Sequence, residues 1–154
     1  MNEYILELGK KAKEASKKLA IIDTNTKNAV LTAVAKALIE KRELIKAENK
    51  KDLEYGKEKG ISSALLDRLE LTDSRIDGMA KSLIEIANFK DPVGEILEGW
   101  KHPDGMQILK QRVPLGVIGM IFESRPNVTI DSAGLALKSS NAIILRGGSD
   151  AINS

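Results

Sequence analysis

The stretch that decides the fold is VPLGVIGMIFESRPNVTIDSAGLALKSSNAIILRGGSDAINS, residues 113–154. It holds two apolar runs, at 116–122 and 142–145, separated by a mixed small-and-apolar stretch at 128–137. The first run does not alternate apolar with polar residues, which is typical of a strand covered on both faces. The spacing of the two runs suits a strand, a crossover helix and a parallel strand. We therefore predict a right-handed βαβ unit, with ligands binding at the carboxyl ends of its strands.

The first 90 residues predict a set of helices. Apolar residues recur at helical spacing in four stretches, at about 5–22, 30–53, 65–69 and 76–87. N-caps are expected within 23–26 and at Thr72 or Asp73, because their side-chain oxygens can accept from free N–H groups. Gly56 and Gly60 are expected to end the second helical stretch, and the proline at 92 to stop the last one.

A β-hairpin is predicted next. The sequence HPDG at 102–105 lies between two short apolar segments, and proline and glycine preset the backbone angles of a turn. The single histidine sits in this turn, where we expect no chemical role for it. A two-stranded hairpin is marginal alone, so we expect it to pair with a second subunit or with further chain.

The composition bounds the class of protein. A chain of 154 residues, 42% hydrophobic and 30% charged, can bury the core of one domain. A net charge of +2 and 3% aromatic residues favour neither nucleic acid nor a membrane surface as a partner. The absence of cysteine excludes disulfides, thiolate metal sites and a thiol nucleophile within the chain, and we expect no metal. Without a signal peptide or a long apolar run, a cytoplasmic location is expected.

The two loops that follow the predicted strands carry the candidate chemistry. Of the 24 basic and 22 acidic residues only six lie beyond residue 112, and half of these six are in the two loops. In the first loop, Ser124 and Asn127 could donate to an oxyanion and Arg125 could hold a carboxylate or phosphate. The same residues also suit a plain connector, in which Asn127 or Thr129 caps the crossover helix and Arg125 pairs with Glu123.

The second loop, RGGS at 146–149, has the chemistry of an anion site. Two glycines let backbone N–H groups approach a phosphate, and Arg146 can bind a phosphate or a ribose. Ser149 would cap a following helix. A plain turn explains the same residues, and neither a GxGxxG fingerprint nor a P-loop is present.

Both loops lie within segments that resemble the γ-glutamyl phosphate reductases, also called glutamate-5-semialdehyde dehydrogenases, of the aldehyde dehydrogenase superfamily. The resemblance rests on VPLGVIGMIFESRPNVT and NAIILRGGS, and upstream on LLDRLELT and DPVGE, so it covers essentially the whole chain. It implies an aldehyde-dehydrogenase-like α/β fold. Residues 1–90 would be N-terminal helices, 91–112 an oligomerisation-type hairpin, and 113–154 the first βαβ of an incomplete, Rossmann-like NADP-binding domain.

The resemblance implies an activity as well: NADPH-dependent reduction of L-glutamyl 5-phosphate to L-glutamate 5-semialdehyde with release of phosphate, in proline biosynthesis. In this family a cysteine thiolate displaces the phosphate before hydride transfer. The chain has no cysteine and family members are well over twice as long, so we expect an amino-terminal piece that is inactive alone. Alternatives are a non-catalytic fragment that binds NADP, or one that interacts with a subunit. A homo-oligomer is expected.

The same resemblance distributes roles over the two loops. The superfamily's oxyanion asparagine matches Ser124 here, so that role is expected of Ser124, Asn127 or backbone N–H groups, with Arg125 on the substrate. The superfamily's ribose-binding lysine corresponds to Arg146, and an arginine there suits the 2′-phosphate of NADPH. The cofactor-binding residues expected are Ile121, Phe122, Glu123, Arg146, Gly147, Gly148 and Ser149.

Overall fold

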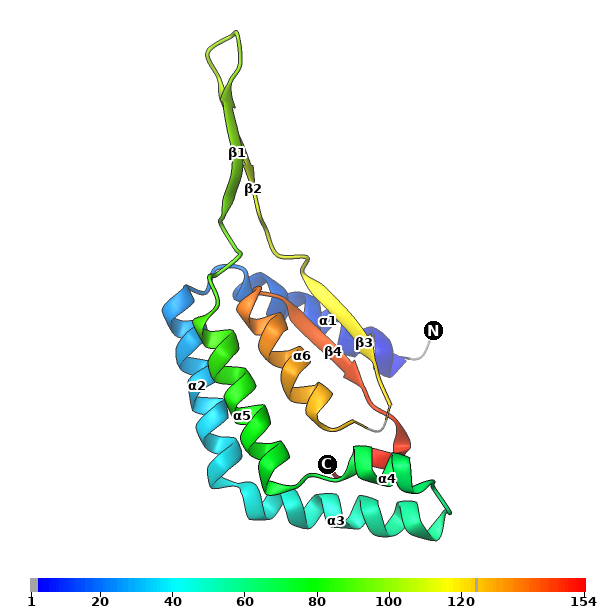
Figure 1. Cartoon of the computed structure of the whole chain (residues 1–154). Coiled ribbons are helices and arrows are strands. Elements are labelled where there is room, and N and C mark those ends of the chain that lie inside the picture. Colours follow the sequence, from blue (N-terminus) through cyan, green and yellow to red (C-terminus); the bar gives the residue numbers. More distant parts are fainter. Residues whose placement is uncertain (1–2, 124) are drawn as a thin grey trace.

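The computed structural model describes residues 3–123 and 125–154, and its secondary structure follows the predicted order (Figure 1). The helices are α1 (Glu3–Leu19), α2 (Thr24–Glu40), α3 (Arg42–Glu58), α4 (Ser63–Leu69), α5 (Asp73–Asn88) and α6 (Asn127–Lys138). The strands are β1 (Ile96–Lys101), β2 (Gln107–Gln111), β3 (Val117–Ile121) and β4 (Ala142–Arg146), followed by the short 3₁₀ helix η1 (Ser149–Ala151). No helix in the described ranges is both long and apolar enough to cross a membrane.

The core lies where α2, α5 and α6 pack side by side (Figure 1). Leu31 of α2 and Ile76 and Leu83 of α5 are all at most 2% exposed. Burying an aliphatic side chain of this size contributes about 1.5–3 kcal/mol, so this cluster is a main source of stability. Two predicted caps are confirmed, because Asp23 accepts from the N–H of Thr26 and Thr72 accepts from the N–H of Arg75.

The two glycines expected to end α3 behave differently. Gly60 follows the helix with φ of +71°, a conformation that glycine adopts without strain. Gly56 lies inside the last turn of α3 and is buried, so the prediction that it ends the helix is wrong. A Cβ atom at this position would lie 3.0 Å from Cδ2 of Leu66. The glycine therefore allows α3 and α4 to approach closely, which is a tertiary reason that the local pattern does not show.

The predicted hairpin is present and stands away from the helices (Figure 1). Strands β1 and β2 are antiparallel and pair only with each other within the described part of the chain. The turn closes where the N–H of His102 donates to the carbonyl of Met106 at 2.8 Å, and Gly105 takes φ of +90°. Apolar side chains on both strands stay exposed, Trp100 among them at 50%.

Strands β3 and β4 form the predicted parallel pair, with Val117 opposite Ala142 and Ile121 opposite Arg146. Helix α6 packs on one face of the pair, and α1 packs mainly against β4 (Figure 1). The prediction that the first strand is covered on both faces is wrong for β3, since its residues are half-buried or exposed and Ile121 is 77% exposed. Its outer edge pairs with no other described strand, so a run this apolar has little to pack against.

Two predicted caps are wrong. Helix α6 starts at Asn127 after Pro126, and neither Asn127 nor Thr129 caps it, because both lie within the helix. Ser149 is the first residue of η1 and the cap position belongs to Gly148, without a side-chain bond. Proline is well suited to the start of a helix because it has no N–H to satisfy.

Candidate active site

The parallel register brings the two predicted loops to one edge of the sheet. The N–H of Phe122 donates to the carbonyl of Arg146 at 3.1 Å, which extends the pairing one residue past β3. The Phe122 ring also lies against the backbone of Gly147, since a Cβ atom there would be 3.5 Å from the ring. Residues 121–123 and 146–148 are therefore neighbours, as expected for the carboxyl ends of parallel strands. Ser124 lies outside the described residues.

The second loop presents free donors to solvent. Arg146, Gly147 and Ser149 are exposed. Within the described residues, neither the Arg146 guanidinium nor the N–H groups of Gly147 and Gly148 have a hydrogen-bond partner. A Cβ atom at Gly147 would make only ordinary contact with Phe122, and the φ of Gly147 is not positive, so no described residue demands glycine there. Unsatisfied N–H groups beside a free guanidinium fit the phosphates of a dinucleotide.

Helix α3 holds the segment that follows this loop in place. Asp52 of α3 is 1% exposed, and its carboxylate accepts from the N–H of Ser154 at 2.8 Å and from the N–H of Asn153 at 3.1 Å. Neighbouring Asn49 donates to the carbonyl of Leu69 and accepts from the N–H of Leu71. Buried polar groups that are fully paired fix one geometry, so α3 anchors both the segment after β4 and the segment after α4.

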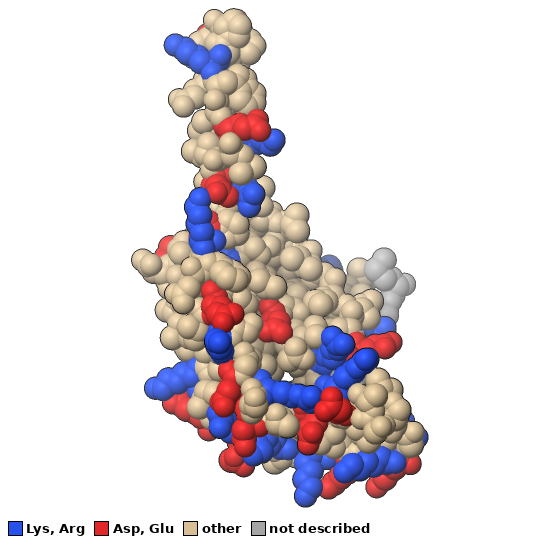
Figure 2. Space-filling model, viewed as in Figure 1, with Lys and Arg blue, Asp and Glu red and all other residues tan. Residues whose placement is uncertain are grey.

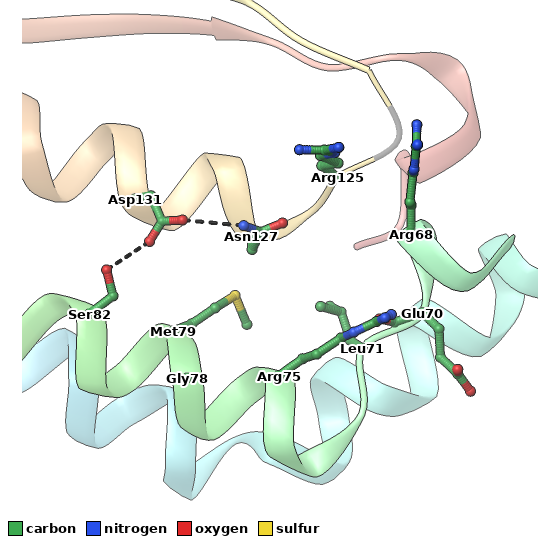
Figure 3. A pocket seen from close by; sticks show the side chains of 10 residues that line it. All are labelled: Arg68, Glu70, Leu71, Arg75, Gly78, Met79, Ser82, Arg125, Asn127 and Asp131. Atoms are coloured by element: carbon green, nitrogen blue, oxygen red, sulfur yellow. Dashed lines mark hydrogen bonds between the residues drawn. The ribbon is translucent and has the colours of Figure 1, made fainter. Parts of the chain in front are cut away.

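A cleft of about 420 Å³ lies beside the first loop, between the α4–α5 region and the start of α6. Figure 3 shows its lining: Arg68, Glu70, Leu71, Arg75, Gly78, Met79, Ser82, Arg125, Asn127 and Asp131. Arg125 approaches from the loop before α6, and Arg68 approaches from α4 (Figure 3). The cleft is thus built from segments more than 40 residues apart in the sequence.

The three arginines of the cleft have different surroundings. Arg75 is occupied, because it donates to the backbone carbonyls of Asp67 and Glu70 and to the Asp67 carboxylate. Arg68 and Arg125 have no hydrogen-bond or ion-pair partner among the described residues. Two unpaired guanidinium groups at one cleft attract an anion and can bind a carboxylate or phosphate through paired N–H donors.

The Asn127 side chain is already engaged. Its amide nitrogen donates to Oδ2 of Asp131 at 3.2 Å, and Ser82 of α5 donates to Oδ1 of the same carboxylate at 3.0 Å (Figure 3). This chain of hydrogen bonds joins α5 to α6 across the cleft. An oxyanion role for Asn127 stays a prediction and would use the second hydrogen of its amide group.

Only Arg125 and Asn127 of the cleft were predicted from the sequence as site residues, and the unpredicted lining includes Arg68, Arg75, Ser82 and Asp131. The first three lie in the helical part, where a charged or small polar side chain at helical spacing is typical of a solvated face. Asp131 offers one local signal, since it follows Asn127 by four residues and so shares its face of the helix. That signal indicates a contact and not a site.

Among solved structures, the NAD-dependent benzaldehyde dehydrogenase of Corynebacterium glutamicum matches with a TM-score of 0.63 at 24% identity, over 91% of this chain and 28% of that one. At this identity the likeness shows the fold alone. The class of protein is therefore an aldehyde-dehydrogenase-like α/β protein, and the predicted fold class is confirmed.

The γ-glutamyl phosphate reductase of Thermotoga maritima matches with a TM-score of 0.94 and 47% identity, over 96% of this chain and 36% of that one. The γ-glutamyl phosphate reductase of Saccharomyces cerevisiae matches with a TM-score of 0.91 and 33% identity, over 96% of this chain and 38% of that one. The curated γ-glutamyl phosphate reductase of Halothermothrix orenii is 54% identical over 154 residues, which are all of this chain and 37% of that protein. The family resemblance is thus confirmed, and the chain spans just over a third of these relatives' length. No protein-family model matches the chain.

Proposed function

We propose that the protein to which this chain belongs reduces L-glutamyl 5-phosphate to L-glutamate 5-semialdehyde with NADPH and releases phosphate, as a cytoplasmic step of proline biosynthesis. The observation that carries the proposal is the cleft beside the β3–α6 loop, where two arginines have no partner among the described residues, in a chain 54% identical to a γ-glutamyl phosphate reductase. Both the substrate and the released phosphate are anions, and an anion is what this cleft attracts.

Each part of the candidate site has one task in this reaction. NADPH supplies a hydride, which replaces the phosphate group on the acyl carbon, and the proton leaves with the released phosphate. The second loop would bind the cofactor, with Arg146 on its 2′-phosphate and the N–H groups of Gly147 and Gly148 on its diphosphate. Ile121, Phe122 and Glu123 would lie along the nicotinamide side. Arg125 would hold the substrate beside the first loop.

The activity test runs the reaction in reverse on the full-length protein that contains residues 1–154. Glutamate 5-semialdehyde, inorganic phosphate and NADP⁺ are supplied, and NADPH is followed by its absorbance. The proposal expects reduction of NADP⁺ that depends on phosphate. A full-length protein that is inactive, or equally active without phosphate, would show the proposal to be wrong. The polypeptide of residues 1–154 alone is expected to be inactive, because it lacks a cysteine.

The cofactor role predicts a selective effect of Arg146→Ala. Losing the charge-assisted bonds to the 2′-phosphate should raise the KM for NADPH by roughly 10- to 100-fold. The KM for NADH should change little, because NADH has no 2′-phosphate. Arg112→Ala, an exposed arginine after the hairpin, is the matched control and should change neither value. An equal change for both cofactors would refute a 2′-phosphate contact.

The hairpin supports a second proposal, that the protein forms a homo-oligomer through β1 and β2. Both strands are exposed along their length except for one half-buried residue, and they pair only with each other among the described residues. A second copy of the same protein would cover their apolar side chains and pair with their free edges.

A further inference from the structure

The cleft carries charges of both signs, and hydrogen bonds from two helix residues hold one of its carboxylates, that of Asp131, in a fixed position. Asp131 is half-buried on α6, and its two oxygens accept one hydrogen bond each, from Ser82 and Asn127. Each carboxylate oxygen can accept two bonds, so both retain capacity. The other carboxylate of the cleft, Glu70, points away from Arg68 and Arg125 (Figure 3).

An acid in this position is hard to explain if the cleft receives only anions. A carboxylate would repel a phosphate dianion, and it would weaken the attraction of Arg125, which precedes it by six residues in the loop before α6. The α-amino-acid end of a substrate is different, since it carries an ammonium and a carboxylate on one carbon. A site for that end needs an acid and an arginine lining one cavity, which this cleft supplies.

Resting on the function proposed above, we propose that this cleft recognises the α-amino-acid end of the substrate. Asp131 binds the α-ammonium group, and Arg68 and Arg125 bind the α-carboxylate. Ser82 and Asn127 are positioning residues, because they fix the Asp131 carboxylate from two sides. The acyl phosphate then extends toward the ends of β3 and β4, where the first loop lies.

The test compares two aldehydes that differ only in the amino group. The full-length protein is assayed in the phosphate-dependent reverse direction with glutamate 5-semialdehyde and with 5-oxopentanoate, at equal concentrations of free aldehyde. The wild type should prefer the amino-acid substrate by roughly 10- to 100-fold in kcat/KM, as expected for a charged group with a matched partner. Asp131→Asn should remove that preference by lowering kcat/KM for glutamate 5-semialdehyde alone.

Two further variants separate recognition from stability. Arg68→Ala should lower kcat/KM for both aldehydes by a similar factor, of about 10-fold, because both contain the carboxylate. Glu85→Gln removes a negative charge from an exposed site on α5 outside the cleft and should leave both substrates unchanged. If Asp131→Asn lowers kcat/KM equally for both substrates, or for neither, the inference is overturned. Asp131 would then serve only to link α5 to α6 through hydrogen bonds.

The wild-type preference keeps the inference testable even if Asp131→Asn fails to fold. A wild type that uses both aldehydes equally well overturns the inference without any variant. A wild type that is inactive toward both overturns the proposed function itself. A wild type that is active and selective, with selectivity lost in Asp131→Asn, supports both.

Discussion

At the residue scale, two buried lysines show how closely the helices are tied together. Lys27 is 1% exposed and its ammonium lies 2.5 Å from Oδ2 of Asp91. Lys138 is 3% exposed and donates to Oδ1 of Asn28 and to the carbonyl of Ala87. Burial lowers the pKa of Lys138 below its ordinary value, outweighing the attraction of Asp91. These bonds join α2, the end of α5 and the end of α6.

The carboxylate of this cluster, Asp91, stays charged to a lower pH than an ordinary aspartate. Burial alone would raise the pKa of Asp91, but hydrogen bonds from Lys27, Thr24 and the N–H of Val93 outweigh it, and the pKa lies below the ordinary value. A carboxyl group with a lowered folded pKa contributes stability that is complete above its unfolded pKa of about 3.9. That contribution is lost as the pH falls through the folded pKa.

We predict that Asp91→Asn destabilises the protein by about 3–5 kcal/mol at pH 7, because Lys27 keeps its buried charge and loses its partner. Urea denaturation gives the free energy of unfolding. The difference from wild type should stay constant down to about pH 4 and shrink below it, as Asp91 becomes protonated. Glu40→Gln, which breaks an exposed pair with Lys36, should cost less than about 1 kcal/mol. Similar losses in the two variants would contradict this account.

At the scale of elements, the approach of α5 to α6 shapes the cleft and depends on one glycine. Gly134 is buried on α6, and a Cβ atom there would lie 2.8 Å from Cδ2 of Leu83 and 3.2 Å from Cδ1 of Ile86. Leu83 is itself 2% exposed, so it has little room to move. The small residue is therefore required by packing, although glycine within a helix is unfavourable by itself.

Gly134→Ala should destabilise the protein despite its better helix propensity. Overpacking costs about 1–3 kcal/mol and the propensity gain is about 1 kcal/mol, so a net loss of roughly 1 kcal/mol is expected. Gly9→Ala in α1 is the matched control, because no atom lies within 4 Å of the new Cβ. That variant should gain about 0.5–1 kcal/mol. Thermal denaturation of both variants measures the change in stability relative to wild type. If both variants are stabilised, α5 and α6 can move apart enough to accept the added methyl group.

At the scale of the whole molecule, the structure is a helical body with a β3–β4 pair at one side and a hairpin arm (Figure 1). Charged side chains of both signs are interspersed over the end where α3 and α4 lie (Figure 2). The arm carries charged side chains too, and it also exposes large apolar ones: Ile96, Leu97, Trp100, Met106 and Leu109. Exposed apolar groups on a projecting hairpin are typical of an interface.

The oligomer proposal predicts that Trp100→Lys shifts the full-length protein to a smaller species. Placing a charge in an apolar interface costs several kcal/mol per copy, which is enough to dissociate a moderate complex at micromolar concentration. Sedimentation equilibrium measures the mass, and Lys101→Gln on the same strand is the control. If the wild type is already a monomer, or if Trp100→Lys leaves its mass unchanged, the hairpin is not the interface.

The sequence by itself determined the order of the elements. Apolar spacing, the caps at Asp23 and Thr72 and the turn before Gly105 act within a few residues, so they can be read locally. It also showed that polar residues follow each predicted strand. Because parallel strands end at one edge of a sheet, these residues could be expected to lie close together. These local signals were enough for helices, a hairpin, one βαβ unit and both loops, and the resemblance to a known family supplied the aldehyde-dehydrogenase-like fold class.

Only the tertiary structure decided the rest, because it depends on contacts between residues far apart in the chain. Arg68 and Asp131 line one cleft although 63 positions separate them, and each alone is typical of a solvated helix face. The buried position of Lys27 depends on Asp91 in the same way. A buried charge requires a partner, because an unpaired charge in the interior is costly. Packing between helices decides which residue becomes that partner, and no local sequence pattern predicts it.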